Sequence, residues 1–255
     1  MRLGMIVGAF ALMAAAAPAF AGEPAAQAMR VGVRHNMEAT LYTPDGPGAF
    51  PTVLLMHTSE GLTETDRSFC AKLAREGFIC IVPAFLLAHG NLRGEFRRLA
   101  FTSAAQEIYD DFVEVIGELN RLPKARPGAA GAIGFSNGGY FALWLAATRQ
   151  VKAGVSYYGA LQGAGTDPRL KRFADTFNAE SSPVLVLAGQ NDSTIGMAVV
   201  NRLSGILNHS GAPHELKVYP DAEHEFDRTA SRAGNKAAEE DAWTRTLAFF
   251  RRYLQ

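Results

Sequence analysis

The sequence predicts an α/β fold in which helices cover both faces of a mostly parallel central sheet. Apolar segments of strand length alternate with segments that carry apolar residues at helical spacing, and short loops join them. The length of 255 residues and a hydrophobic content of 48% suit one domain of this class. A Gly-x-Ser-x-Gly motif lies between a short apolar run and a helix-forming run, as at a sharp strand-to-helix turn.

The N-terminal segment has the composition of an export signal. Arg2 supplies the positive start, residues 3–17 form an apolar core, and residues 19–21 form a small-x-small cleavage site. The core is shorter than the roughly 20 residues that span a bilayer. We therefore expect a signal peptide over 1–21, a mature domain over 22–255 and a periplasmic or secreted location. The alternative is a retained anchor or an ordinary buried helix.

Charge balance bears on the expected partners. The chain has 25 basic and 25 acidic side chains and a formal net charge of +0. This balance gives no reason to expect nucleic acid or a membrane surface as a partner of the mature protein. We expect a small-molecule substrate and no metal or organic cofactor. The sequence carries no indication of an oligomeric state.

The chain has two cysteines, Cys70 and Cys80. They lie on an expected helix and on the strand after it, at similar distances from the turn at Gly77. An oxidising compartment permits a disulfide between them. The alternative is a pair of small, buried apolar residues.

The first half of the mature chain begins with an expected loose leader and a hairpin. Strand patterns over 31–34 and 38–42 flank a turn at His35 and Asn36, after the leader at 23–28. We then expect a buried strand over 52–56, a helix over 64–76 that closes on a glycine, and a second buried strand over 78–82 that a proline stops.

Residues 84–99 have an irregular pattern, and we expect them to form a small lid over the site. This segment carries a histidine and three arginines: His89, Arg93, Arg97 and Arg98. The remaining expected helices cover 103–122, 141–147, 197–208 and 237–253, and the remaining strands cover 129–133, 153–157, 183–188 and 215–219. Residues 161–182 are expected to be mostly loop with one short helix.

The turn at Ser136 is the first candidate catalytic feature. A turn this sharp brings the side chains two positions before and after the serine against neighbouring backbone. Gly134 and Gly138 occupy those positions and relieve the collision. The turn is expected to lift the Ser136 hydroxyl clear of the sheet, beside a helix N-terminus.

An acid and a base follow the serine in the order that α/β-hydrolases use. Asp192 and His224 come after the strands at 183–188 and 215–219, and parallel sheets gather chemistry at such strand ends. His224 is the expected general base, with Asp192 orienting its imidazole. Asp221 and Glu223 flank the histidine and compete for that role. Asp192 is preferred because it lies on a separate strand end, in a Gly-x-x-Asp turn.

Backbone donors are needed for the negative oxygen of a tetrahedral intermediate. The amide of Asn137, at the start of the helix, is the first expected donor. The second is expected from the loop after the strand at 52–56, at Ser59. His57 lies in the same loop, where it is a candidate for shaping the oxyanion site. The remaining histidines are expected to be surface or capping residues: His35, His89, His209 and His214.

The chain resembles the dienelactone hydrolase family of α/β-hydrolases, over nearly all of the mature domain. The matching segments are 73–78 with Pro83, 134–139, 157–159, 188–192 and 219–226. The resemblance implies that nucleophile, acid and base are Ser136, Asp192 and His224. The founding enzymes have a cysteine nucleophile, and they carry a glutamate at the position that Thr58 occupies in this chain. The nearest glutamate of this chain, Glu60, lies two residues later. A plain Ser-His-Asp mechanism is therefore expected.

The resemblance also bears on the substrate. Family members that act on carboxylate-bearing lactones hold the carboxylate with two arginines. One lies four residues after the histidine, where Arg228 falls, and the other lies upstream, where Arg93, Arg97 and Arg98 are all candidates. The alternative for Arg228 is an exposed arginine partly neutralised by Asp227. We expect a small ester or lactone as substrate, with a carboxylate-bearing one left open. The rivals are a carboxylesterase or deacetylase of neutral or polymeric esters, and a non-catalytic binding protein on a hydrolase scaffold.

Overall fold

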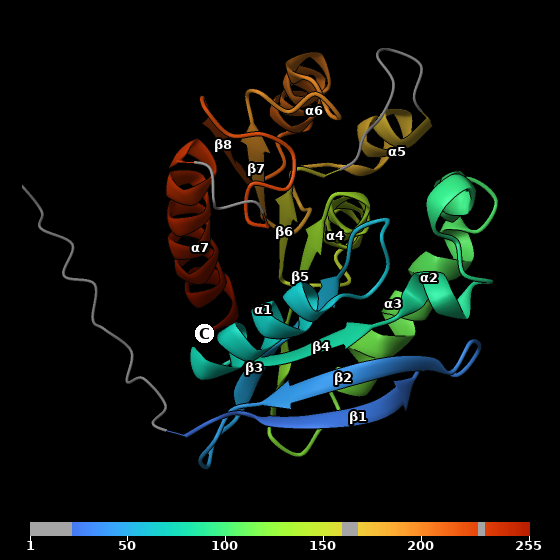
Figure 1. The fold of residues 1–255 in the computed structure, drawn as a ribbon, viewed down its shortest axis with the longest axis vertical. Coiled ribbons are helices and arrows are strands. Elements are labelled where there is room, and N and C mark those ends of the chain that lie inside the picture. Colours follow the sequence, from blue (N-terminus) through green and yellow to red (C-terminus); the bar gives the residue numbers. More distant parts are fainter. Residues whose placement is uncertain (1–21, 160–167, 229–232) are drawn as a thin grey trace, which may run out of the picture.

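One mixed sheet runs through the protein, and its strands follow the order β1-β2-β4-β3-β5-β6-β7-β8 (Figure 1). The computed structural model describes residues 22–159, 168–228 and 233–255. The strands are β1 Ala25–Val31, β2 Met37–Thr43, β3 Phe50–Met56, β4 Ile79–Pro83, β5 Ala125–Phe135, β6 Ala153–Tyr157, β7 Val184–Gly189 and β8 His214–Tyr219. Strands β4, β3, β5, β6, β7 and β8 are parallel, whereas β2 pairs antiparallel with β4 and β1 antiparallel with β2. The mostly parallel sheet expected from the sequence is confirmed.

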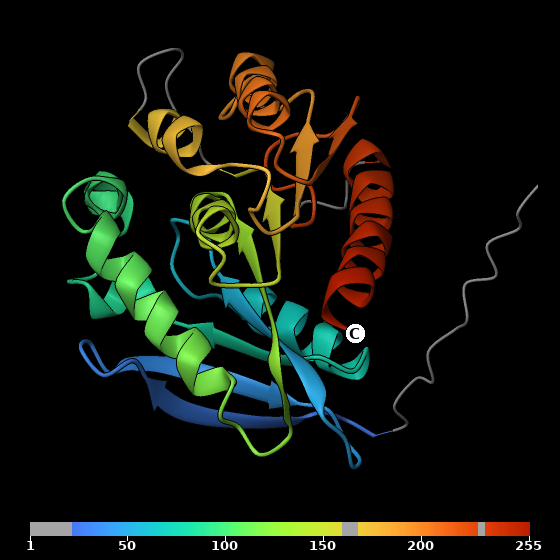
Figure 2. The same ribbon diagram turned by 180° about the vertical axis from the view of Figure 1, so that it is seen from behind.

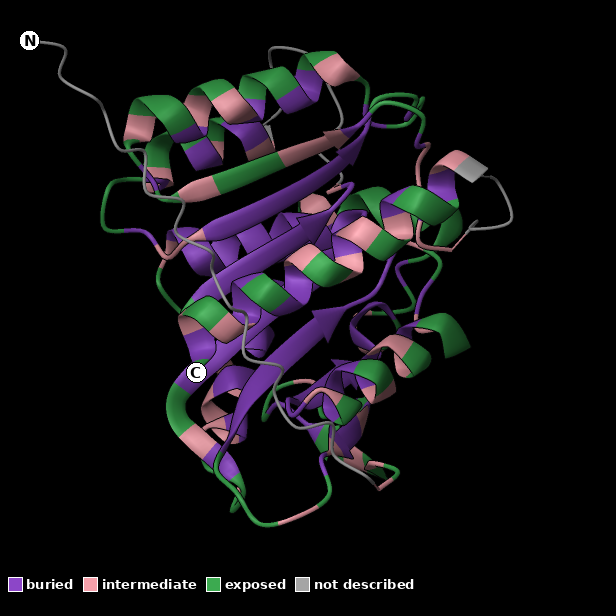
Figure 3. Ribbon diagram, turned by 90° about the vertical axis from the view of Figure 1, so that its left-hand side faces the viewer, coloured by how far each residue is buried: buried purple, intermediate pink, exposed green. Residues whose placement is uncertain are grey.

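Helices cover both faces of the sheet (Figures 1 and 2). Their bounds are α1 Glu64–Arg75, α2 Phe85–Ala88, the 3-10 helix η1 Gly94–Phe101, α3 Ala105–Leu119, α4 Asn137–Ala147, α5 Pro168–Thr176, α6 Met197–Ser210 and α7 Ala233–Leu254. Side chains from α3, α4, α5 and α6 pack into one apolar core, and those from α1 and α7 into the core on the opposite face. The central strands lie between these two layers and are buried along their length (Figure 3).

The N-terminal hairpin differs from the sequence prediction. Residues 23–28 were expected as a loose leader, but β1 begins at Ala25 and ends at Val31. Most β1 side chains are exposed, because this edge strand is held by its backbone pairing with β2 rather than by an apolar face. The turn is wider than predicted: residues 32–36 separate the strands, and the Asn36 amide donates to the Gly32 carbonyl at 3.0 Å.

Residues 84–99 are less irregular than predicted, since they form α2 and the first part of η1. A lid function for this segment stays a prediction. The cysteines form a disulfide that joins α1 to β4, with Cα atoms 5.2 Å apart for Cys70 and Cys80. The predicted export signal at 1–21 lies outside the described residues. Within the described part of the chain, no helix is both long and apolar enough to cross a bilayer.

Candidate active site

Ser136 lies at the tight turn between β5 and α4, as predicted. Its φ of 50° and ψ of −113° form a conformation that non-glycine residues rarely adopt. A Cβ atom at Gly134 would lie 2.1 Å from the Gly138 backbone, and one at Gly138 would lie 2.1 Å from the Met56 carbonyl oxygen. Both positions therefore require glycine, and the packing they allow presses the serine turn against the end of β3.

The structure brings together the three side chains predicted as a triad. His224 Nε2 lies 3.1 Å from Ser136 Oγ, and His224 Nδ1 lies 2.7 Å from Asp192 Oδ2. Ser136 and Asp192 are 6% and 5% exposed, while the imidazole is partly exposed between them. An imidazole in this line can accept the serine proton on one nitrogen while the carboxylate holds the hydrogen on the other.

Asp192 is fixed from both sides. Its Oδ1 accepts hydrogen bonds from the backbone amides of Thr194 and Ile195, each at 2.8 Å, which leaves Oδ2 for the imidazole. Its loop packs directly on the histidine loop, since a Cβ atom at Gly189 would lie 2.4 Å from the Ala222 carbonyl oxygen. The aspartate is therefore rigidly placed before any substrate binds.

The competing carboxylates are arranged differently. Asp221 is exposed, and Glu223 is partly exposed with its amide bound to Asn235 Oδ1 at 3.0 Å. Within the described residues, the carboxylate paired with His224 is that of Asp192. The geometry therefore favours Asp192, in agreement with the sequence argument.

The loop after β3, residues 57–61 (the oxyanion loop), carries Ser59, the predicted second oxyanion donor. The amides of Glu60 and Gly61 are bound within the loop, to Thr58 Oγ1 at 3.3 Å and to the Thr58 carbonyl oxygen at 3.3 Å. The Ser59 amide has no partner among the described residues. Asn137 is the first residue of α4, where helix geometry leaves the amide free. Glu60 is exposed, whereas Thr58 is buried and contributes to the shape of the loop.

His57 supports this loop from inside the protein. It is fully buried and stacks on Phe85 with ring centroids 4.1 Å apart, and its Nδ1 lies 2.7 Å from the Thr58 carbonyl oxygen. Burial lowers its pKa from 6.5 to about 4, because the charged imidazolium would lose its hydration. The neutral ring can therefore donate from Nδ1 to the carbonyl oxygen, which fits the predicted role in shaping the loop.

The side chain of Arg228 is only 12% exposed, so the alternative of an exposed arginine is wrong. Its guanidinium pairs with Asp66 at 2.6 Å and lies 3.9 Å from the Asp227 carboxylate. Asp66 is fully buried in the first turn of α1, where it also accepts hydrogen bonds from the amide and hydroxyl of Thr63. Sequence reasoning missed Asp66. The Thr-x-x-Asp capping signal was visible, but nothing local indicated a partner 162 residues away.

A second buried carboxyl lies beside this pair. Tyr158 donates a short hydrogen bond to Asp227, and its ring lies 4.8 Å from the His224 imidazole. Burial raises the pKa of Asp227 to about 6, although the neighbouring Arg228 opposes the shift. Arg228 and Asp227 thus belong to a buried polar network behind the histidine, which contributes to its position.

An open cleft of about 540 Å³ borders the oxyanion loop. Its lining comes from the first two strands, the oxyanion loop, α1 and residues 84–93: Ala28, Met29, Arg30, Glu38, Ala39, Thr40, His57, Gly61, Leu62, Arg67, Ala84, Leu87 and Arg93. Ser136 is not among the lining residues. The cleft thus reaches the loop that carries Ser59 but does not enclose Ser136.

Among the arginines predicted to hold a substrate carboxylate, Arg93 is the one that lines this cleft. It is exposed, its Nε donates to Asn91 Oδ1 at 2.5 Å, and its side chain packs against Gly61 of the oxyanion loop. Within the described residues, no carboxylate forms an ion pair with it. Arg97 and Arg98 are exposed on η1 and do not line the cleft.

Known proteins resemble this chain over most of its length. The model of a family described as the dienelactone hydrolase family matches residues 37–254. A carboxymethylenebutenolidase of Rhodococcus opacus is 29% identical over 217 residues, covering 84% of this chain and 86% of the relative. A protein of Escherichia coli strain K12 named "Putative carboxymethylenebutenolidase" is 28% identical over 218 residues, covering 82% and 79%.

A solved structure shares the fold. The crystal structure of a protein from Klebsiella pneumoniae, titled "Putative Dienelactone Hydrolase", superposes with a TM-score of 0.77 at 26% identity. The match covers 91% of this chain and 100% of that chain. The similarity therefore extends over nearly all of this fold.

Proposed function

Because the chain belongs to the dienelactone hydrolase family of α/β-hydrolases, we propose that it is an exported serine hydrolase that cleaves a small ester or lactone. Family membership makes it a hydrolase of carboxylic esters. The observation that carries the finer proposal is the line from Ser136 Oγ through His224 to Asp192, at 3.1 and 2.7 Å. This line supplies both a hydroxyl nucleophile and a base that can accept its proton.

The proposed reaction has two halves. His224 accepts the Ser136 proton while the hydroxyl oxygen attacks the ester carbonyl carbon, and the amides of Ser59 and Asn137 hold the resulting oxyanion. His224 then gives the proton to the leaving alkoxide, which breaks the ester bond and leaves an acyl-enzyme. Water, deprotonated by His224, then attacks the acyl carbon. The bond from that carbon to Ser136 Oγ breaks, His224 returns the proton to Oγ, and the acid leaves. General acid-base catalysis of this kind contributes about 10²–10⁴-fold to the rate.

Export is the second part of the proposal. The signal pattern over 1–21 supports it, and so does the Cys70–Cys80 disulfide, because such bonds persist mainly in oxidising compartments. The periplasm or the medium is therefore the proposed site of action. Fractionation of cells that produce the full-length protein tests this: N-terminal sequencing of an exported form should begin near Gly22, and an uncleaved cytoplasmic protein would contradict it.

A carboxylate on the substrate is supported by the cleft rather than by Arg228. The guanidinium of Arg228 already neutralises Asp66, whereas Arg93 borders the oxyanion loop without an acidic partner among the described residues. Arg30 and Arg67 also line the cleft, but Arg30 pairs with Glu38 at 3.0 Å and Arg67 with Glu64 at 3.7 Å. An anionic ester held by Arg93 is therefore the favoured substrate class, and a neutral or polymeric ester is the rival.

The direct test compares the purified protein with its Ser136→Ala variant on a panel of p-nitrophenyl esters. The proposal expects turnover by the wild type and a loss of about 10³-fold or more in the variant, since the nucleophile is removed. Full activity in Ser136→Ala would refute the nucleophile. No turnover of any ester by a folded wild type would favour a non-catalytic binding protein on a hydrolase scaffold.

A further inference from the structure

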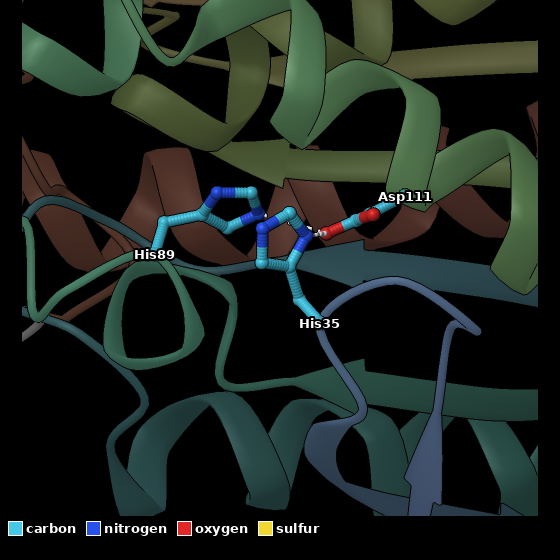
Figure 4. A group of neighbouring side chains, drawn as sticks. All are labelled: His35, His89 and Asp111. Carbon is cyan, nitrogen blue, oxygen red and sulfur yellow. Dashed lines mark hydrogen bonds and ion pairs between the residues drawn. The ribbon is translucent and has the colours of Figure 1, made fainter.

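Two histidines and an aspartate from distant parts of the chain meet away from the serine site. Figure 4 shows the imidazoles of His35 and His89 pointing toward the carboxylate of Asp111. His35 lies in the hairpin between β1 and β2, His89 directly follows α2, and Asp111 lies on α3. His35 Nδ1 and His89 Nε2 lie 2.7 and 2.8 Å from the same oxygen, Oδ2 of Asp111.

The carboxylate at the centre of this cluster is buried, and no lysine or arginine among the described residues pairs with it. Asp111 is fully buried, the side chain of His89 is 2% exposed and that of His35 is 30% exposed. The neighbouring cation, Arg34, is engaged by Asp110 at 3.1 Å and by Glu114 at 2.9 Å. Burial of a carboxylate is costly unless a positive group compensates it. Compensation must therefore come from protonated imidazole or from a bound cation.

One polar atom of the cluster has no partner. Asp111 Oδ1 is buried and makes no hydrogen bond among the described residues. A fully buried carboxylate normally uses both oxygens, so a single unsatisfied oxygen in a native site requires an explanation. A cation that the carboxylate binds through both oxygens would engage Oδ1 as well as Oδ2.

The donor set matches a divalent transition metal. We propose that His35, His89 and Asp111 bind such an ion, and that Zn²⁺ is the ion whose preferences they match best. Zn²⁺ takes imidazole nitrogens and carboxylate oxygens, often with three protein ligands and one water. A mixed nitrogen and oxygen set without thiolate argues against Fe–S clusters, and two imidazoles argue against Ca²⁺ and Mg²⁺.

The spacing of the donor atoms fits this ion after a small adjustment. The three ligand atoms lie within 4.8 Å of one another. Ligands on a tetrahedral Zn²⁺ lie about 3.3 Å apart. Each imidazole nitrogen, now 2.7 or 2.8 Å from Asp111 Oδ2, would therefore move away from that oxygen by about 0.5 Å. His35 can move because it lies on a partly exposed turn, and the same exposed side gives the ion and a water ligand access.

The position of the cluster indicates what the ion does. It joins the hairpin, the end of α2 and the middle of α3, which are far apart in sequence. Phe85, the first residue of α2, stacks on His57 beneath the oxyanion loop. The ion therefore braces the wall beside the cleft, and it takes no part in the serine chemistry proposed above.

The proposal is tested by titrating the chelator-treated, dialysed protein with Zn²⁺ and measuring the binding by isothermal titration calorimetry. We expect saturable binding of one ion per chain and a rise in the melting temperature on loading. His35→Ala and His89→Ala should each weaken binding by about ten-fold or more. His209→Ala, which removes an exposed histidine on α6, is the matched control and should bind as the wild type does.

Two further measurements keep the outcome decisive. His224→Ala should retain binding, which distinguishes the cluster from the triad histidine. X-ray absorption of the zinc-loaded protein should show two imidazoles and no sulfur in the coordination shell. The proposal is overturned if the wild type shows no saturable site, or if a folded His35→Ala variant binds Zn²⁺ as tightly as the wild type. Either result would leave the cluster as a purely hydrogen-bonded contact.

Discussion

Replacing Asp192 with asparagine tests the proposed triad without removing its shape. In the wild type, Oδ1 accepts the amides of Thr194 and Ile195, and Oδ2 faces His224 Nδ1. An asparagine has one acceptor oxygen, and two amide donors would hold it on the Oδ1 side. Its NH₂ group would then face His224 and donate to Nδ1. The imidazole must respond by carrying its hydrogen on Nε2, the nitrogen that should accept the serine proton.

The expected cost is a loss of about 10⁴-fold in kcat, because the base is present in the wrong tautomer. At about 1.4 kcal/mol for each factor of ten, this is about 5.5 kcal/mol of lost transition-state stabilisation. The melting temperature should change by only a few degrees, since both backbone hydrogen bonds to the side chain remain. Stopped-flow or steady-state hydrolysis of a p-nitrophenyl ester, paired with a thermal melt, measures both quantities.

Matched variants of the neighbouring carboxylates complete the experiment. Asp221→Asn should retain activity within a few-fold of the wild type, because that side chain is exposed and makes no ion pair with His224 among the described residues. The reasoning is refuted if Asp192→Asn keeps activity within about ten-fold of the wild type, or if Asp221→Asn loses as much.

Three further predictions follow from the packing and charges around the site. Gly138→Ala should lower the free energy of unfolding by at least about 2 kcal/mol, because its Cβ would meet a backbone oxygen at 2.1 Å. Gly205→Ala, with open space around it, should be neutral or stabilising in the same denaturant titration. Burial lowers the pKa of His57 from 6.5 to about 4, so its contribution to stability is present above pH 6.5 and is lost as the pH falls toward 4. Between pH 7 and pH 4, the free energy of unfolding should therefore fall by about 3 kcal/mol less in His57→Gln than in the wild type. Equal falls in the two proteins would contradict this assignment. Arg93→Ala should lower kcat/KM for a carboxylate-bearing ester about ten-fold more than for a neutral one. Arg228→Ala should lower kcat/KM for the two esters by the same factor, because it leaves the buried carboxylate of Asp66 unpaired. A larger loss on the carboxylate-bearing ester in Arg228→Ala would instead assign the substrate carboxylate to Arg228.

Local sequence patterns predicted most of the fold and the centre of the site. Buried parallel strands are continuous apolar runs, and the glycines at 134 and 138 are required by contacts within a few residues of Ser136. The positions of Asp192 and His224 followed from topology, because parallel strands end at one edge of a sheet. These features depend on short-range geometry or on strand order, and a single sequence carries both.

Features that depend on distant pairing were not predicted. Strand β1 has mostly exposed side chains and is held by backbone hydrogen bonds to β2, so no apolar pattern indicated it. The ion pair of Asp66 with Arg228 and the meeting of His35 and His89 at Asp111 join residues with no shared local signal. His89 was expected to be a surface or capping residue; it follows α2 as a cap, yet it is buried.

Covalent labelling by a fluorophosphonate probe tests the central claim most directly, because the probe reacts with a serine only when a base activates it. The wild type should gain the mass of one probe, located by peptide mass spectrometry on Ser136. Ser136→Ala should gain none, and His224→Ala should react far more slowly although its serine is intact. A folded wild type that stays unlabelled, or labelling that persists in Ser136→Ala, would contradict the account.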